Sequence, residues 1–416
     1  MGRALGCYER AAVLTDGRAP FHAAIAATFD MELDPDEVRR ALSQTVRRAP
    51  LASMYPVDGR FEPCGVAEPE FIVMDGDGAT LDAEVDVLLS DRPRQRGVHP
   101  VRARLIRSPT TTSLLIAAPH YLVDAISLGN LLFGALGDGD EVASGAAQTP
   151  PAVEDLFPAA YRGLRAAPRI AAFVASQVAD DAHVRLNRIG AGPPRAPPPG
   201  RSRHVVRDLD ADFALRLGAA MRRRECTLNG LLAAVAARVF ATRFLQRADG
   251  PVTVMGFRDL RQRVEPPIAA DAIGVNFSMV RHVIELSGEN IWDSAAQASR
   301  TLAVSGRRGD AFVANLIAPQ MVAAAFAMGM RFADVAVSAP LLKWPRATFV
   351  QDLRRFSGFV SAMPLAPPLS IIAAQSPAGL SLSFMYVDSE FDAQTAAAMA
   401  DEVIGRLAAA LNGAQS

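Results

Sequence analysis

Residues 113–136 read SLLIAAPHYLVDAISLGNLLFGAL, and this stretch decides the class of fold. The apolar run at 113–118 predicts a short buried strand, and residues 125–136 predict a helix. The connection Pro119-His120-Tyr121-Leu122-Val123-Asp124 lies between them, and Asp124 can cap the helix. Strand ends in α/β folds often expose functional side chains, so His120 is the first candidate for a functional residue.

The rest of the chain also alternates between helix and strand. Asp34-Pro35 predicts the start of a helix, in which Val38, Leu42 and Val46 repeat at helical spacing, and Pro50 ends it. After residue 200 we expect a strand beginning at 205–206, helices at 210–223 and 228–240 with Thr227 capping the second, strands at 252–255, 278–284 and 380–386, and a last helix at 393–411. The predicted fold class is therefore mixed α/β.

A proline-rich segment divides the chain into two parts of similar length. Residues 190–201 read GAGPPRAPPPGR, and its five prolines favour extended backbone that joins no packed core. We expect an N-terminal half at 1–189, a linker at 190–201 and a C-terminal half at 202–416. Parts of this size are typical of two domains or of a duplicated fold.

Composition excludes several classes of function. The net charge of −1 gives no field that attracts nucleic acid or anionic membrane, and we expect neither as a partner. Lys343 is the only lysine, so no phosphate-binding GxxxxGK[ST] loop is present. Three widely spaced cysteines favour neither a disulfide framework nor a metal site and fit the reducing cytoplasm. The apolar stretch 311–330 is interrupted by polar residues and proline, which favours a buried helix over a membrane span.

The pair His120 and Asp124 is the strongest candidate for chemistry. Among six histidines, only His120 has an aspartate four residues later. A neutral imidazole can take a proton from an alcohol or amine near pH 7, so His120 is a candidate general base. On this motif alone an alternative stays open, in which His120 is a packed strand-end histidine and Asp124 only caps a helix.

The other histidines are weaker candidates. His22, His99, His183 and His204 have no nearby acidic or cysteine partner in the sequence and are expected on the surface or in the core. His282 lies beside Arg281 on an alternating strand, and a substrate-channel role is the minor alternative for it. The acidic run at 208–212 lacks the glycine and distal glutamate of a calcium loop, so we interpret it as a strand end and a helix cap.

Several segments together resemble the chloramphenicol-acetyltransferase-like superfamily. His120-x-x-x-Asp124 resembles its HHxxxDG motif, found in nonribosomal peptide condensation domains, polyketide-associated acyltransferases and wax ester synthases. The resemblance continues, in the order of the family, through LDPDEVRRAL (33–42), RAPL (48–51), TLNGLLAAVA (227–236), VTVMGFRDLRQRVEPP (252–267) and IGVN (273–276). It covers the chain from about residue 5 to 411.

This resemblance implies a fold and a set of site residues. It implies two acetyltransferase-like halves that form a pseudo-dimer, with a tunnel between them and the histidine at its middle. The implied catalytic residues are His120 and Asp124, with Asp124 held by an arginine as structural support. By alignment that arginine is Arg261, and Arg258 is the second choice. Pro119 and Ala125 replace the usual first histidine and glycine, which leaves the oxyanion donor unassigned.

The implied function is that of a stand-alone acyltransferase of secondary metabolite or lipid biosynthesis. It would move an acyl group from acyl-CoA or an acyl carrier protein to a small alcohol or amine, as a cytoplasmic monomer. The CoA or phosphopantetheinyl thioester would be a co-substrate, and no metal or tightly bound cofactor is expected. Two alternatives remain: a discrete condensation enzyme that forms an amide between carrier-bound substrates, and a non-catalytic domain that docks a carrier protein.

Overall fold

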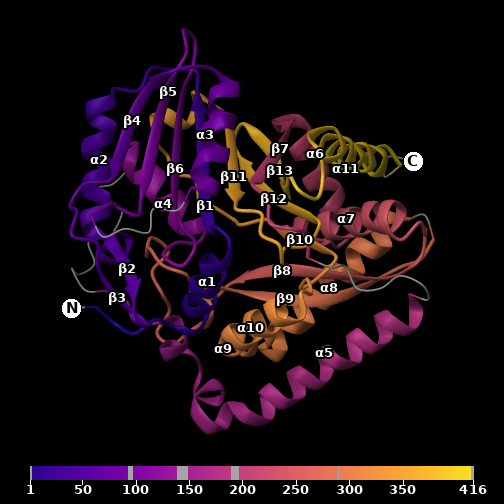
Figure 1. Cartoon of the computed structure of the whole chain (residues 1–416). Coiled ribbons are helices and arrows are strands. Elements are labelled where there is room, and N and C mark those ends of the chain that lie inside the picture. Colours follow the sequence, from indigo (N-terminus) through magenta and orange to yellow (C-terminus); the bar gives the residue numbers. More distant parts are fainter. Residues whose placement is uncertain (1, 92–96, 138–148, 189–195, 289, 414–416) are drawn as a thin grey trace.

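The computed structural model describes residues 2–91, 97–137, 149–188, 196–288 and 290–413, which form two lobes side by side (Figure 1). The strands are β1 (His22–Phe29), β2 (Met54–Val57), β3 (Arg60–Pro63), β4 (Glu70–Asp75), β5 (Arg102–Arg107), β6 (Thr112–Pro119), β7 (Ser202–Asp210), β8 (Gly250–Asp259), β9 (Phe277–Leu286), β10 (Val335–Ser338), β11 (Leu353–Val360), β12 (Leu369–Ser376) and β13 (Gly379–Val387).

The α-helices are α1 (Cys7–Arg18), α2 (Pro35–Arg48), α3 (Gly78–Ser90), α4 (Ala125–Ala135), α5 (Ala167–Asn187), α6 (Ala211–Arg223), α7 (Leu228–Phe244), α8 (Ile291–Arg308), α9 (Asp310–Leu316), α10 (Ala318–Met328) and α11 (Ala393–Gly413). Short 3-10 helices are η1 (Pro50–Ser53), η2 (Val153–Leu156), η3 (Ala159–Tyr161), η4 (Gly163–Ala166), η5 (Arg261–Arg263) and η6 (Thr348–Val350).

The first lobe is built on a five-stranded sheet in the order β11-β1-β6-β5-β4. Side chains of β6 alternate between its two faces, as the period of a strand requires. Leu114 and Ile116 join the core formed with α2 and α4, whereas Leu115 and Ala117 pack with α3. Both faces of the sheet are therefore covered by helices, which accounts for the apolar run from Leu114 to Ala118 in this strand.

The second lobe contains a six-stranded sheet in the order β7-β13-β12-β10-β8-β9. Strand β10 runs parallel to both β8 and β12, and the other neighbours in this sheet are antiparallel. Helices α7, α8 and α11 pack on one face, and α7 is buried continuously from Gly230 to Ala241. The opposite face of β8 and β10 looks toward the first lobe.

Strand β11 connects the two lobes. It belongs to the C-terminal half of the chain, yet it pairs with β1 of the first sheet. Ala24 lies opposite Phe359, and Ala26 lies opposite Ser357. It also contacts β12 and β13 of the second sheet (Figure 1). The two lobes therefore share one strand.

The predicted linker can be compared with the structure only in part, because residues 189–195 lie outside the described residues. Residues 196–201 form no helix or strand, and β7 begins at Ser202. The domain boundaries at 189 and 202 remain predictions.

The helices that were predicted from a capping residue at their first turn are confirmed. The Asp34 carboxylate accepts a hydrogen bond from the backbone N–H of Asp36 at 2.8 Å and begins α2. Thr227 caps α7 through the N–H of Gly230 at 3.1 Å. Asp210 ends β7 and caps α6, as expected of the acidic run at 208–212.

The expectation of one buried helix at 311–330 is wrong. The segment forms two helices, α9 and α10, which meet at 66°. Pro319 lies in the first turn of α10, where its missing N–H costs no hydrogen bond. Within the described residues, no single helix is both long and apolar enough to cross a membrane. Helices α9 and α10 meet the criteria of length and apolar composition only when they are counted together.

Candidate active site

The turn between β6 and α4 places His120 at the interface of the two lobes. The backbone N–H of His120 donates to the carbonyl of Phe21 at 2.9 Å, which continues the pairing of β6 with β1. The N–H of Leu122 then donates to the carbonyl of Pro119 at 3.0 Å and closes the turn. Asp124 begins α4 by accepting from the N–H of Ser127 at 2.8 Å. Both ends of the short loop are thus fixed by hydrogen bonds.

One hydrogen bond sets the tautomer of the His120 ring. Nδ1 lies 2.7 Å from the carbonyl oxygen of Val123. A carbonyl can only accept, so Nδ1 carries the proton and donates, and in the neutral ring Nε2 keeps its lone pair. The ring stacks on that of Phe277, with 5.4 Å between the ring centroids, and its centroid lies 4.8 Å from that of the Phe21 ring. Its orientation is therefore fixed by packing as well as by the hydrogen bond.

The surroundings of His120 favour the neutral imidazole. Burial lowers the pKa of His120 below its ordinary value, because the charged ring loses solvation. The hydrogen bond to Val123 and the charge of Asp124 act in the opposite direction but do not offset this effect. A neutral ring near pH 7 is the form that can accept a proton.

Asp124 forms a buried ion pair with Arg261. Burial alone would raise the pKa of Asp124, but Arg261 and the N–H groups of Ser127 and Asn276 hold it below its ordinary value. The Asn276 N–H donates to Asp124 Oδ2 at 3.0 Å. Arg261 also donates to Asp259 Oδ1 at 3.0 Å. Both carboxylate oxygens of Asp124 are thus occupied by donors other than His120.

Ser127 and Gly274 extend this network, in roles that no sequence pattern had assigned to them. The Ser127 hydroxyl donates to the carbonyl of Gly274 at 2.8 Å and accepts from the N–H of Gly274 at 3.0 Å. It also accepts from Arg261 Nη2 at 3.1 Å. These bonds attach the start of α4 in the first lobe to the segment before β9 in the second.

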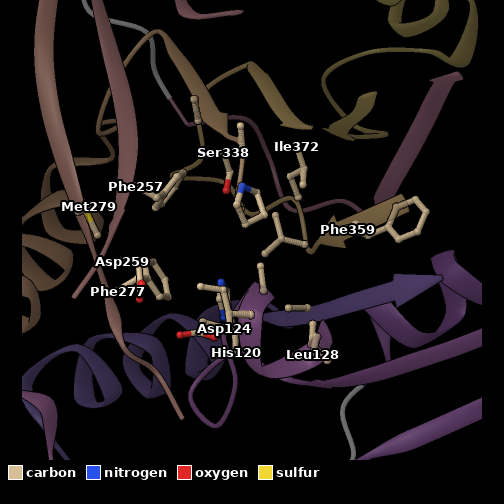
Figure 2. A pocket seen from close by; sticks show the side chains of 18 of the residues that line it. His120, Asp124, Leu128, Phe257, Asp259, Phe277, Met279, Ser338, Phe359 and Ile372 are labelled. Carbon is tan, nitrogen blue, oxygen red and sulfur yellow. The ribbon is translucent and has the colours of Figure 1, made fainter. Parts of the chain in front are cut away.

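A cavity of about 490 Å³ lies between the lobes, and His120 is one of its walls. The His120 side chain is partly exposed there, so the ring is not sealed by packing. Figure 2 shows His120 and Asp124 at one wall, with Ser338 across the space. The other walls are mainly apolar and come from both lobes: Phe21, Ile25, Leu128, Met255, Phe257, Phe277, Met279, Phe359 and Ile372.

The remaining candidates from the sequence fall in different places. Arg258 lines the cavity but donates to the carbonyl of Leu302 at 3.1 Å, so Arg261 is the arginine that pairs with Asp124. His282 is buried away from the cavity lining, and neither ring nitrogen has a hydrogen-bond partner. Burial lowers the pKa of His282 to about 4, and a substrate-channel role for this residue finds no support.

The four other histidines lie on the surface or in packed regions, as expected. His22 and His99 are buried, and His183 is exposed beside Glu285. His204 is packed against the acidic residues Asp82 and Asp86 of α3, partners more than a hundred residues away that sequence spacing did not reveal. No three histidine, cysteine, aspartate or glutamate side chains in the described ranges are grouped so that they could hold a metal ion.

The two departures from the family motif cause no visible strain. Pro119 is the last residue of β6 and lies opposite His22 of β1. Ala125 is the first residue of α4. The non-glycine residues with positive φ in the part of the chain that the structure describes are Asp58, Glu225 and Gln246, so Ala125 does not need the freedom of glycine.

Comparison with known proteins indicates where this fold occurs. Residues 198–306 match the family described as phthiocerol/phthiodiolone dimycocerosyl transferase C-terminus. No curated protein matches the sequence. A trichothecene 15-O-acetyltransferase from Fusarium sporotrichioides has a similar structure, with a TM-score of 0.73, 13% identity and coverage of 97% of this chain and 94% of that chain.

Two solved structures from peptide synthetases are also similar. The first condensation domain of the calcium-dependent antibiotic synthetase has a TM-score of 0.69 and 15% identity, covering 98% of this chain and 96% of that chain. The EpoB cyclization-docking bidomain from Sorangium cellulosum has a TM-score of 0.69 and 17% identity, covering 99% and 85%. These likenesses extend over nearly the whole chain and both lobes.

Proposed function

Because the chain has the two-lobed fold of the condensation-domain and acyltransferase superfamily, we propose that it transfers an acyl group from a thioester to an alcohol or amine. The donor is acyl-CoA or an acyl carrier protein, and His120 is the general base. The observation that carries the proposal is the His120 ring, whose Nδ1 donates to Val123 and whose side chain lines the cavity between the lobes.

The proposed reaction needs one base and no covalent enzyme intermediate. Nε2 of His120 takes the proton from the acceptor O–H or N–H as the oxygen or nitrogen attacks the thioester carbonyl. The tetrahedral intermediate collapses by breaking the C–S bond, and the protonated ring returns the proton to the leaving thiolate. The products are an ester or amide and a free thiol, so protons and electrons balance and His120 ends neutral.

Asp124 serves this reaction as a positioning residue. Its oxygens are bound to Arg261, Ser127 and Asn276, so it holds the loop of His120 and the adjacent lobe in place. The mainly apolar walls of the cavity support an apolar acyl group or acceptor, because burial of apolar surface stabilises the complex.

The likeness to condensation domains supports a second candidate, amide formation between two carrier-bound groups. The same base and cavity would serve that reaction, with an amine on the second carrier as the acceptor. The donors and acceptors that are accepted distinguish the two candidates, because a transferase for small molecules needs no second carrier protein.

The test of the proposal is release of free thiol from a panel of acyl-CoAs and acyl carrier proteins with alcohol and amine acceptors. His120→Ala should lower kcat/KM by about 10²- to 10⁴-fold, the range for loss of a positioned base. The matched control is His183→Ala, since His183 is an exposed histidine bound to Glu285. Equal rates in wild type and His120→Ala would refute the role of His120. Absence of transfer with every donor and acceptor would favour a non-catalytic carrier-docking domain.

A further inference from the structure

The cavity that contains His120 is also lined by two arginines without acidic partners. Arg258 lies at the end of β8, and Arg263 lies in η5. Arg261, between them in sequence, is occupied by Asp124 and Asp259. Among the described residues, neither Arg258 nor Arg263 pairs with a carboxylate. The cavity wall therefore carries three arginines against two carboxylates, a net charge of +1, and both carboxylates are bound to Arg261.

The position of Arg258 is unfavourable unless an anion is bound. Its side chain is half-buried, and its Nη1 donates to one neutral acceptor, the carbonyl of Leu302 on α8, at 3.1 Å. Burial lowers the pKa of Arg258, and the charge of Arg263 lowers it further. Partial burial of one cation near another is costly, and a bound anion would offset both the lost solvation and the repulsion.

The beginning of α7 and the side chain of Arg258 both contact helix α8. The N–H of Thr227, the cap of α7, donates to the Ser299 hydroxyl of α8 at 2.9 Å. Ser299 and Leu302 are three residues apart on α8 and are therefore neighbours on its surface. The start of α7 and the guanidinium of Arg258 thus both contact α8, at Ser299 and at Leu302. A helix N-terminus carries partial positive charge and free N–H groups.

Asn229, in the first turn of α7, provides an independent sign of a missing ligand. It lines the same cavity, and its amide oxygen is buried without a hydrogen-bond partner. Unpaired buried polar atoms are rare because they cost free energy. A half-turn of this amide would present its NH2 group in the same place, where it can donate to an anion.

From this geometry we propose that Arg258, Arg263 and the start of α7 form a phosphate subsite. The subsite would bind the phosphate of the phosphopantetheine arm, the group that CoA and a carrier protein have in common. Arginine suits this role because its planar fork binds phosphate oxygens at two points. The inference rests on the proposed use of a thioester donor, and it places the phosphate at Arg258 while the thioester lies at His120.

Binding measurements test the subsite without any need for turnover. The probes are CoA, 4′-phosphopantetheine and pantetheine, titrated calorimetrically into the wild type and an Arg258→Gln/Arg263→Gln double variant. We expect the double variant to bind CoA and 4′-phosphopantetheine about 10- to 100-fold more weakly, the effect of losing charge-assisted hydrogen bonds. Binding of pantetheine, which has no phosphate, should stay within about twofold, on the same reasoning.

A matched arginine controls for a general loss of charge. Arg307→Gln removes an exposed arginine of α8 that does not line the cavity, and it should leave all three affinities unchanged. The inference is overturned if the double variant binds CoA as tightly as the wild type, or if pantetheine loses affinity to the same extent. The inference is also overturned if the double variant loses affinity for CoA but not for 4′-phosphopantetheine, because the arginines would then bind the adenosine 3′-phosphate.

Kinetics separate the two sources of the phosphate and keep the two proposals distinct. If the enzyme transfers acyl groups, the double variant should raise KM for acyl-CoA or for acyl carrier protein, whichever is the donor, and leave KM for acyl-pantetheine unchanged. A rise with acyl-pantetheine as well would contradict the subsite. If no donor supports transfer, the proposed function fails, and the CoA and 4′-phosphopantetheine titrations still decide whether the subsite exists.

Discussion

The guanidinium of Arg261 binds both carboxylate oxygens of Asp124, with 2.8 Å between Nη1 and Oδ2 and 2.9 Å between Nη2 and Oδ1. Both residues are almost completely buried, with exposed fractions of 2% and 4%. Asp124 begins α4 in the first lobe, whereas Arg261 follows β8 in the second. This pair therefore fixes the loop of His120 relative to the opposite side of the cavity.

Removal of the arginine should destabilise the protein strongly. Arg261→Met leaves the Asp124 carboxylate buried and unpaired, so we expect the free energy of unfolding to fall by about 3–5 kcal/mol in urea titrations. The double variant Asp124→Asn/Arg261→Met should recover part of this loss, because the unpaired charge is gone. As a control, Arg39→Met breaks an exposed pair with Asp36 and should cost less than about 1 kcal/mol. Similar losses at Arg261 and Arg39 would contradict this account.

The pH dependence of transfer should report the lowered pKa of His120. The neutral ring is the base, so kcat/KM should fall as the pH decreases through the pKa of His120. Because burial lowers that pKa below 6.5, the inflection should lie below 6.5 and the rate should be level above it. The measurement is kcat/KM from pH 4.5 to 8.5 with a donor that does not titrate in this range. An inflection above 6.5 would show that the charged ring is stabilised.

The size of the acyl group should be limited at Gly358. This residue of β11 lines the cavity, and a Cβ atom added there would lie 3.3 Å from Cγ2 of Ile372. Gly358→Val should fill that space and lower kcat/KM for a long acyl donor by at least about tenfold, a factor equivalent to about 1.4 kcal/mol. Acetyl-CoA is the internal control, and its kcat/KM should change little. An equal loss for both donors would indicate a distorted site instead of a shorter cavity.

A charged cluster of His204, Arg203, Asp82 and Asp86 between the lobes should make stability depend on pH. Burial alone would lower the pKa of His204, but its hydrogen bonds with Asp82 and Asp86 hold the pKa above its ordinary value. His204 Nδ1 lies 2.8 Å from Asp86 Oδ1, and Arg203 Nη1 binds the other oxygen of Asp86 at the same distance. Asp388 and Tyr386 are the other titratable groups near Arg203.

Protonated His204 is stabilised in the fold, so its contribution is complete below pH 6.5. It is lost as the pH rises through the raised pKa of the folded state. The free energy of unfolding should therefore decrease between pH 6 and 9, and His204→Gln should flatten that decrease. His183→Gln, at an exposed position, is the control and should leave the curve unchanged. A wild-type curve as flat as that of His204→Gln would refute the prediction.

Local signals explain which parts of the fold could be predicted. Asp34, Thr227 and Asp210 are helix caps in the structure, and each was recognisable from the residue itself and the periodic residues after it. The division at 311–330 was missed, although Asn315, Pro319 and Gln320 interrupt the apolar run. The change of direction between α9 and α10 depends on packing that no short window of sequence contains.

The candidate site was only partly visible in the sequence. His120 and Asp124 stand in one short motif, and the family resemblance suggested Arg261. The contacts of Ser127 with Gly274 join residues 147 positions apart, so spacing could not reveal them. Asn229 and Arg258 likewise meet the same cavity from different elements. Such groups become visible only when both lobes are assembled.

The shared strand has a consequence for dissection of the protein. The hydrogen-bonding groups of β1 that face β11 are satisfied by residues 353–360, which follow the second sheet's strand β10 in the chain. A fragment that ended at Arg188 would expose that side of β1 as a ready template for intermolecular strand pairing. Separately expressed lobes should therefore aggregate, and residues 353–360 supplied as a peptide in trans should suppress that aggregation.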